Sequence, residues 1–165
     1  MKRILSFLVP AAFVAILVVV AIKALAGDES RIRSQIEAFT VAFNDQNLGN
    51  CLDVIDPGYR DESVTEVDRK MLTTVLRYVF MKQMRSDGKA VAMRIRVPEQ
   101  SLHIEIDEGE KAHVDFEGIL ENRKGEEWRL QWHVQVESTM RKVDGDWLIY
   151  RTRHSTLEGK RPQGF

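Results

Sequence analysis

The chain has 165 residues, with 24 basic and 25 acidic side chains and a net charge of −1 at pH 7. After residue 27 the balance is mildly acidic, with 21 basic and 25 acidic residues, which argues against a nucleic-acid partner because such a role needs a basic face. Residues 28–165 suffice for one ordinary domain, and the single cysteine, Cys51, excludes an internal disulfide.

The first segment of the chain is strongly apolar. Residues 4–22 carry no charge and are bracketed by Lys2, Arg3 and Lys23. At about 1.5 Å per residue this run spans roughly 28 Å as a helix, which matches the hydrocarbon thickness of a bilayer. We therefore predict a signal-anchor transmembrane helix within residues 1–27, and a single-pass membrane protein whose following domain is extracytoplasmic.

Two other interpretations of this segment stay open. Ala24-Leu25-Ala26 fits a signal-peptide cleavage site, so that the domain would be secreted after cleavage near Ala26. Against cleavage, the apolar run is longer than a typical signal peptide, and Lys23 lies just before the site. A buried core helix is the third interpretation, and it fits less well because the segment has no polar stripe.

Three helices are predicted next. The first has an apolar stripe at spacings of four, three and four residues, formed by Ile32, Ile36, Phe39 and Phe43. A second, shorter helix covers about residues 48–55 and is stopped by Asp56-Pro57-Gly58. The third begins near Ser63, which fits a capping box with Glu66, and runs to about Met84.

After Gly88 the apolar period changes from that of a helix to that of a strand. Alternation predicts five strands, at about residues 93–97, 102–106, 114–120, 128–136 and 147–150. A tight hairpin turn is expected at Asp144-Gly145. One apolar and one polar face is typical of an antiparallel sheet packed on one side. We predict an α+β domain in which three helices cover one face of a curved antiparallel sheet.

The same alternation assigns side chains to the two faces. His103, His113 and His133 fall on the polar face, and no metal-ligand spacing supports a site among them. Trp128 and Trp132 lie four residues apart and are therefore expected to share the apolar face. We expect neither a metal nor a cofactor.

The last strand allows two registers, and alternation alone does not choose between them. If Trp147 points inward, Arg151 and Arg153 follow on the same face, where two guanidinium groups suit an anion. If Tyr150 points inward instead, His154 follows it. A β-bulge would exchange the two outcomes.

Two motifs stand out in this order of elements: Asp56-Pro57-Gly58-Tyr59-Arg60-Asp61, and Lys142-Val143-Asp144-Gly145-Asp146-Trp147-Leu148-Ile149. With the three helices before them, they resemble the nuclear transport factor 2-like (NTF2-like) superfamily, including its SnoaL-like polyketide-cyclase and ketosteroid-isomerase branches. The resemblance covers about residues 30–155 and implies a cone whose mouth can hold a small apolar ligand. Members include isomerases, dehydratases, cyclases, dimeric binding proteins and membrane-tethered assembly subunits, so the fold does not select an activity.

The resemblance also implies where a site would lie. Enzymes of the superfamily place Asp, His or Tyr inside the cone as acid or base, and Tyr59 and Asp61 fall at its mouth. If the chain is an enzyme, the catalytic candidates are Tyr59, Asp61 and His154, with His154 as the base. The simpler interpretation is that Tyr59 packs on the core and Asp61 caps a turn. The ligand-binding candidates are four side chains of the predicted sheet: Trp128, Trp132, Arg151 and Arg153.

No nucleophile elbow, phosphate loop or dinucleotide-binding glycine pattern occurs in the sequence. Since the inner face of the sheet is predicted to be wholly apolar, we predict a non-catalytic binding or interaction module, tethered to a membrane by residues 4–22. It would act as a homo-oligomer or with a partner protein. The alternative is an isomerase, dehydratase or cyclase that acts on a small apolar ligand. The expected organisation is an anchor (1–27), an NTF2-like domain (28–158) and a flexible tail (159–165).

Overall fold

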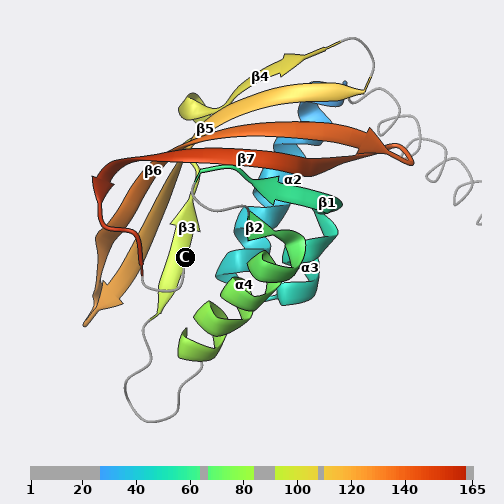
Figure 1. Ribbon diagram of the computed structural model, residues 1–165. Helices are drawn as coiled ribbons and strands as arrows, with labels where there is room; N and C mark the ends of the chain where they lie inside the picture. The colour runs from blue at the N-terminus through green and yellow to red at the C-terminus, as the bar shows by residue number, and fades with distance from the viewer. Residues whose placement is uncertain (1–26, 64–66, 84–91, 108–109, 163–165) are drawn as a thin grey trace, which may run out of the picture.

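Figure 1 shows the computed structural model, in which residues 27–63, 67–83, 92–107 and 110–162 are described. The apolar segment 4–22 lies outside these ranges. Among the described helices, none combines the length and apolar character that crossing a bilayer requires.

Helices α2 (Asp28–Asn44), α3 (Leu48–Asp53) and α4 (Arg69–Gln83) pack on one face of a curved sheet (Figure 1). The predicted stripe of the first helix is confirmed, because Ile32 and Phe43 are fully buried against the sheet. Asn47 caps α3, since its side-chain oxygen accepts a hydrogen bond from the Asn50 N–H.

The predicted start of the third helix at Ser63 is wrong. Val67–Asp68 form the short strand β2, and α4 begins at Arg69. Asp68 caps it instead, accepting a hydrogen bond from the Met71 N–H at 2.8 Å. The predicted capping partner Glu66 and the predicted end near Met84 lie outside the described residues.

The remaining strands are β1 (Ile55–Asp61), β3 (Met93–Arg96), β4 (His103–Ile106), β5 (Lys111–Lys124), β6 (Glu127–Val143) and β7 (Asp146–Gly159). Along the sheet their order is β2-β1-β7-β6-β5-β3, and β4 pairs with another part of β5. The three long strands β5, β6 and β7 form the predicted meander. The Asp144-Gly145 hairpin turn is confirmed, with φ angles of +52° and +92° at its two residues.

The sheet is mixed, so the prediction of a purely antiparallel sheet is wrong. β1 runs parallel to β7, and the two strands are joined by the long connection that parallel pairing requires, which includes α4 and the strands β3 to β6. Asp56-Pro57-Gly58, predicted to stop a helix, forms an irregularity within β1 between the paired residues Ile55 and Arg60. There the fully buried Asp56 carboxylate accepts hydrogen bonds from the Arg141 guanidinium at 2.5 and 2.7 Å.

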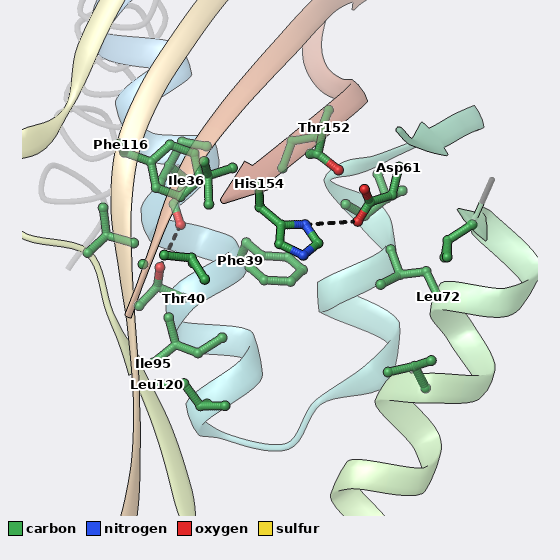
Figure 2. A pocket seen from close by; sticks show the side chains of 18 of the residues that line it. Ile36, Phe39, Thr40, Asp61, Leu72, Ile95, Phe116, Leu120, Thr152 and His154 are labelled. Carbon is green, nitrogen blue, oxygen red and sulfur yellow. Dashed lines mark hydrogen bonds and ion pairs between the residues drawn. The ribbon is translucent and has the colours of Figure 1, made fainter. Parts of the chain in front are cut away.

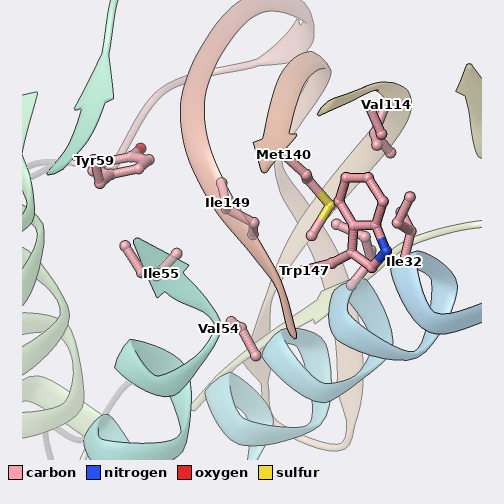
Figure 3. Close-up of a cluster of buried hydrophobic side chains, with 10 residues drawn as sticks. Ile32, Val54, Ile55, Tyr59, Val114, Met140, Trp147 and Ile149 are labelled. Atoms are coloured by element: carbon pink, nitrogen blue, oxygen red, sulfur yellow. The ribbon is translucent and has the colours of Figure 1, made fainter. Parts of the chain in front are cut away.

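Two clusters of buried side chains join the helices to the sheet. Figure 3 shows the first, in which Trp147 and Met140 of the sheet pack near Ile32 of α2. The second joins Phe43 and Phe80, whose rings meet edge to face, to the inner face of the sheet. Between the two clusters lies a cavity.

Candidate functional site

The cavity has a volume of about 230 Å³ and is almost entirely apolar. Ile36 and Phe39 of α2 and Leu72 of α4 form its helical wall, and Phe116 contributes to its sheet wall (Figure 2). Trp132 also lines the cavity from the sheet. An engineered apolar cavity of about 150 Å³ holds benzene. This cavity therefore has room for a ligand of one or two rings.

One end of the cavity is polar. Tyr59 and Asp61 reach it from β1, and Thr152 and His154 reach it from β7. The parallel pairing of the two strands places Asp61 beside Thr152. The prediction of a wholly apolar inner face is therefore wrong. The three catalytic candidates, separated by up to 95 positions in the chain, line the same cavity.

A β-bulge at Tyr150 produces this polar end. Ile149 pairs with Met140 and Arg151 pairs with Thr139, which leaves Tyr150 as an extra residue in β7. Trp147 and Ile149 point inward before the bulge, and Thr152 and His154 line the cavity after it. Neither of the two predicted registers of the last strand holds along its whole length. One inserted residue changes the face on which the following side chains lie.

His154 is held in a defined orientation. Its Nδ1 lies 2.7 Å from the Ser63 hydroxyl and 3.4 Å from an Asp61 carboxylate oxygen (Figure 2). The backbone N–H of His154 also donates to the Ser63 hydroxyl, and the Trp132 ring meets the imidazole edge to face at a centroid distance of 5.2 Å. Within the described part of the chain, Nε2 has no hydrogen-bond partner.

The electrostatics of this group favour an ionised Asp61. Burial alone would raise the pKa of the Asp61 carboxyl, but hydrogen bonds from His154 and Ser63 outweigh burial, and the pKa lies below its ordinary value. A carboxylate only accepts hydrogen bonds, so it favours the imidazole tautomer with the proton on Nδ1. Nε2 then presents a lone pair to the cavity.

Tyr59 supplies a neutral donor beside this base. Its side chain is buried, and its hydroxyl lies 2.6 Å from the Thr152 hydroxyl. Burial raises the pKa of the phenol well above its ordinary value, outweighing the contact with Thr152. Tyr59 therefore keeps its proton at neutral pH and can donate a hydrogen bond to a ligand oxygen.

Of the two tryptophans predicted to share a face, only Trp132 lines the cavity. Trp132 pairs with Leu120 and Leu130 pairs with Glu121, so Gln131 is an extra residue in β6. This bulge moves Trp128 to the outer face, where its ring lies under the Arg94 guanidinium at 4.4 Å. The prediction of a shared face is wrong because a bulge interrupts the alternation.

Arg151 and Arg153 lie on the outer face of the sheet and do not line the cavity. Both pair with Glu62, at 2.8 Å from Arg151 and 3.5 Å from Arg153. The bulge at Tyr150 that brings His154 inward is what turns these two arginines outward. They contribute to a polar hollow on that face.

The histidines predicted on the polar face do lie there. His103 and His113 are exposed, and His133 hydrogen-bonds Glu117 at 2.9 Å. The described residues contain no group of three or more His, Cys, Asp or Glu side chains that could hold a metal.

Sequence reasoning missed two residues of this site. Ser63 was assigned to a helix cap, although its spacing from Asp61 suits the turn in which its N–H donates to the Asp61 carboxylate at 2.8 Å. Arg161 was assigned to the tail, yet it lines the cavity. No local pattern marks Arg161, since its position depends on where β7 ends.

Solved structures of very different sequence share this fold. An NTF2-like protein with a cystatin-like fold from Novosphingobium aromaticivorans gives a TM-score of 0.65 at 11% identity, over 86% of this chain and 90% of that chain. A candidate scytalone dehydratase from the same organism gives 0.64 at 13% identity, over 79% and 85%. The CamKII hub homology domain of Chlamydomonas reinhardtii gives 0.64 at 12% identity, over 80% and 100%.

At these identities the likeness shows the fold alone, and the chain has the NTF2-like α+β fold that its sequence predicts. No protein-family model matches the sequence, and no curated protein matches it.

Proposed function

We propose that this chain is a small-molecule enzyme that moves a proton on a compact apolar substrate, as an isomerase or dehydratase does. The observation that carries the proposal is the His154–Asp61 pair in an apolar cavity, with Nε2 of His154 unpartnered among the described residues. A base, a group that orients it and a nearby donor are the parts that acid–base catalysis requires. The fold of a candidate scytalone dehydratase supports this class.

The chemistry follows from the positions of the three side chains. Nε2 of His154 takes a proton from a C–H beside a substrate carbonyl, and the electron pair moves to the carbonyl oxygen. Ionised Asp61 stabilises the imidazolium that forms, and the neutral Tyr59 hydroxyl donates a hydrogen bond to the developing oxyanion. Return of the proton to another carbon completes an isomerisation. Its transfer to a departing hydroxyl group releases water and completes a dehydration.

The experiment measures exchange of the acidic C–H protons of 2-tetralone in D₂O by NMR, with the full-length chain as catalyst. We expect the protein to accelerate the exchange, and His154→Gln to lower the rate about 100-fold, as loss of a general base does. His133→Gln is the matched control, because His133 hydrogen-bonds Glu117 on the outer face. It should leave the rate unchanged.

Equal rates for the wild type and His154→Gln would refute the proposal. That result would favour the non-catalytic binding or interaction role predicted from the sequence. The prediction of that role relied on a wholly apolar inner face, which is not present. The exchange assay therefore decides between the catalytic role and the non-catalytic one.

We also propose that residues 4–22 tether the enzyme to a membrane as an uncleaved anchor, with the domain extracytoplasmic. The alternative is a signal peptide removed near Ala26, which would release the domain. The length and uniform apolarity of the segment support this proposal. A compact apolar substrate would partition into the same bilayer, so tethering would keep the cavity close to its substrate.

A further inference from the structure

The chain after β7 turns back to the cavity. Gly159 ends the strand with a φ of +79°. Gln131, the bulge residue of β6, then holds Lys160 by two hydrogen bonds. The Lys160 N–H donates to the Gln131 carbonyl at 2.9 Å, and the Gln131 side chain donates to the Lys160 carbonyl at 3.1 Å. This anchoring fixes the backbone next to Arg161, which lines the cavity.

Arg161 is the one arginine or lysine among the described residues that line the cavity. Its Nε is buried and has no hydrogen-bond partner among the residues that the structure describes. Within the described ranges, no carboxylate forms an ion pair with it. The one carboxylate of the lining, Asp61, is engaged by His154 and Ser63.

The Arg161 guanidinium needs a hydrogen-bond acceptor that the described lining of the cavity does not supply. A buried donor that lacks a hydrogen bond costs free energy, and Nε of Arg161 is such a donor although the side chain as a whole is only partly buried. A guanidinium presents a planar set of donors that fits a carboxylate in two-point contact. The other described lining residues are mostly apolar and offer no competing anion.

We infer that the ligand of this cavity is an apolar acid. A hydrocarbon body of one or two rings fills the apolar part, and a carboxylate group binds Arg161. The inference rests on the proposed function and deepens it, because it names the substrate class of the same cavity. It also assigns a binding role to Arg161, which the proton-transfer chemistry does not use.

The test compares two ligands of the same shape and different charge, 2-naphthoate and 2-naphthamide. Their affinities are measured by calorimetry with the full-length chain in lipid nanodiscs, and empty nanodiscs provide the baseline. We expect the chain to bind the carboxylate about tenfold more tightly than the amide, the size of one charge-assisted hydrogen bond. Arg161→Gln should remove this preference without weakening the amide, and Arg161→Lys should keep part of it.

Lys160→Gln is the matched control. It removes a positive charge one residue away, on a side chain that is exposed and does not line the cavity. The preference for the carboxylate should survive this change. Equal affinities in the wild type, a preference that survives Arg161→Gln, or no binding of either ligand would each overturn the inference. The comparison of the two ligands with the wild-type chain tests the inference even if a variant fails to fold.

Failure of the inference and failure of the proposed function give different results. If His154→Gln has no effect on proton exchange but the preference for the carboxylate depends on Arg161, the catalytic proposal alone fails. If exchange depends on His154 but the two naphthalene ligands bind equally, the apolar-acid inference alone fails.

Discussion

Tyr150 is an extra residue in β7, and it determines that Thr152 and His154 reach the cavity. Its own ring does not line the cavity and makes cation–π contacts with the guanidinium groups of Arg141 and Arg151, at 4.4 and 5.2 Å. By interrupting the alternation it directs His154 inward. Asp61 then holds the imidazole of His154 in place, so that two residues from different strands form one acid–base pair.

The Asp61→Asn variant tests the charge of that group. Because hydrogen bonds from His154 and Ser63 lower the pKa of Asp61 in the folded state, ionisation of its carboxyl stabilises the fold. We expect the variant to be less stable than the wild type at pH 7 by about 1–2 kcal/mol in urea unfolding.

The sign of the pH effect follows from the same shift. The stabilisation is fully present above the ordinary value of 3.8 and is lost as the pH falls through the lower folded-state value. The difference between wild type and Asp61→Asn should therefore shrink in unfolding experiments at acid pH. A difference that is the same at neutral and acid pH would contradict this account.

Among the secondary-structure elements, β6 contributes to the cavity in two ways. Its bulge at Gln131 moves Trp128 to the outer face and leaves Trp132 in the cavity wall. The same residue binds the chain after β7 and so positions Arg161. An irregularity in the strand thus shapes both the apolar wall and the charged edge of the cavity.

Gly159→Ala tests how this edge is built. A Cβ at Gly159 would lie 2.5 Å from the Gln131 carbonyl oxygen, and its φ of +79° is unfavourable for alanine. We expect the variant to lose about 2–3 kcal/mol of unfolding free energy and to lose the preference for 2-naphthoate.

Gly125→Ala is the matched control for Gly159→Ala. Its φ of +65° is similarly unfavourable, but a Cβ there has no neighbour within 4 Å. We expect it to cost about 1 kcal/mol in the same urea experiment and to leave ligand preference intact. Equal costs for the two variants would show that the close approach to Gln131 has no role.

On the scale of the whole molecule, the helices and the inner face of the sheet enclose the candidate cavity, and the proposed tether at residues 4–22 would bring it to a lipid surface. The bilayer would then act as a reservoir for an apolar acid, whose body partitions into lipid while its charge stays at the interface. The proposed substrate class and the proposed tether therefore suit each other.

Fractionation of expressing cells tests the tether. We expect the full-length chain to stay in the membrane pellet after washing with alkaline carbonate, because about 19 apolar residues anchor a helix firmly. The intact mass of the chain recovered from the pellet and from the soluble and secreted fractions then separates the anchor from the cleaved alternative. A mass that includes residues 1–26 indicates an anchor, and a chain that begins at Gly27 indicates cleavage. An uncleaved chain in the carbonate supernatant would contradict both.

The sequence by itself determined the α+β class and the meander of strands, and its resemblance to the NTF2-like superfamily implied the fold. The class and the meander depend on apolar period and turn chemistry, which are local properties of the chain. The stripe of Ile32 and Phe43 and the turn at Asp144-Gly145 could be identified because each is set by residues within a few positions of one another.

Only the tertiary structure decided the contents of the cavity. The bulges at Tyr150 and Gln131 change the face of the sheet on which Thr152, His154 and Trp128 lie, and no local sequence pattern predicts these bulges. The parallel pairing of β1 with β7, which brings Asp61 to His154, depends on contacts about 90 residues apart. A strand has a period of two, so one inserted residue reverses every later assignment, and the sequence does not show where the insertion falls.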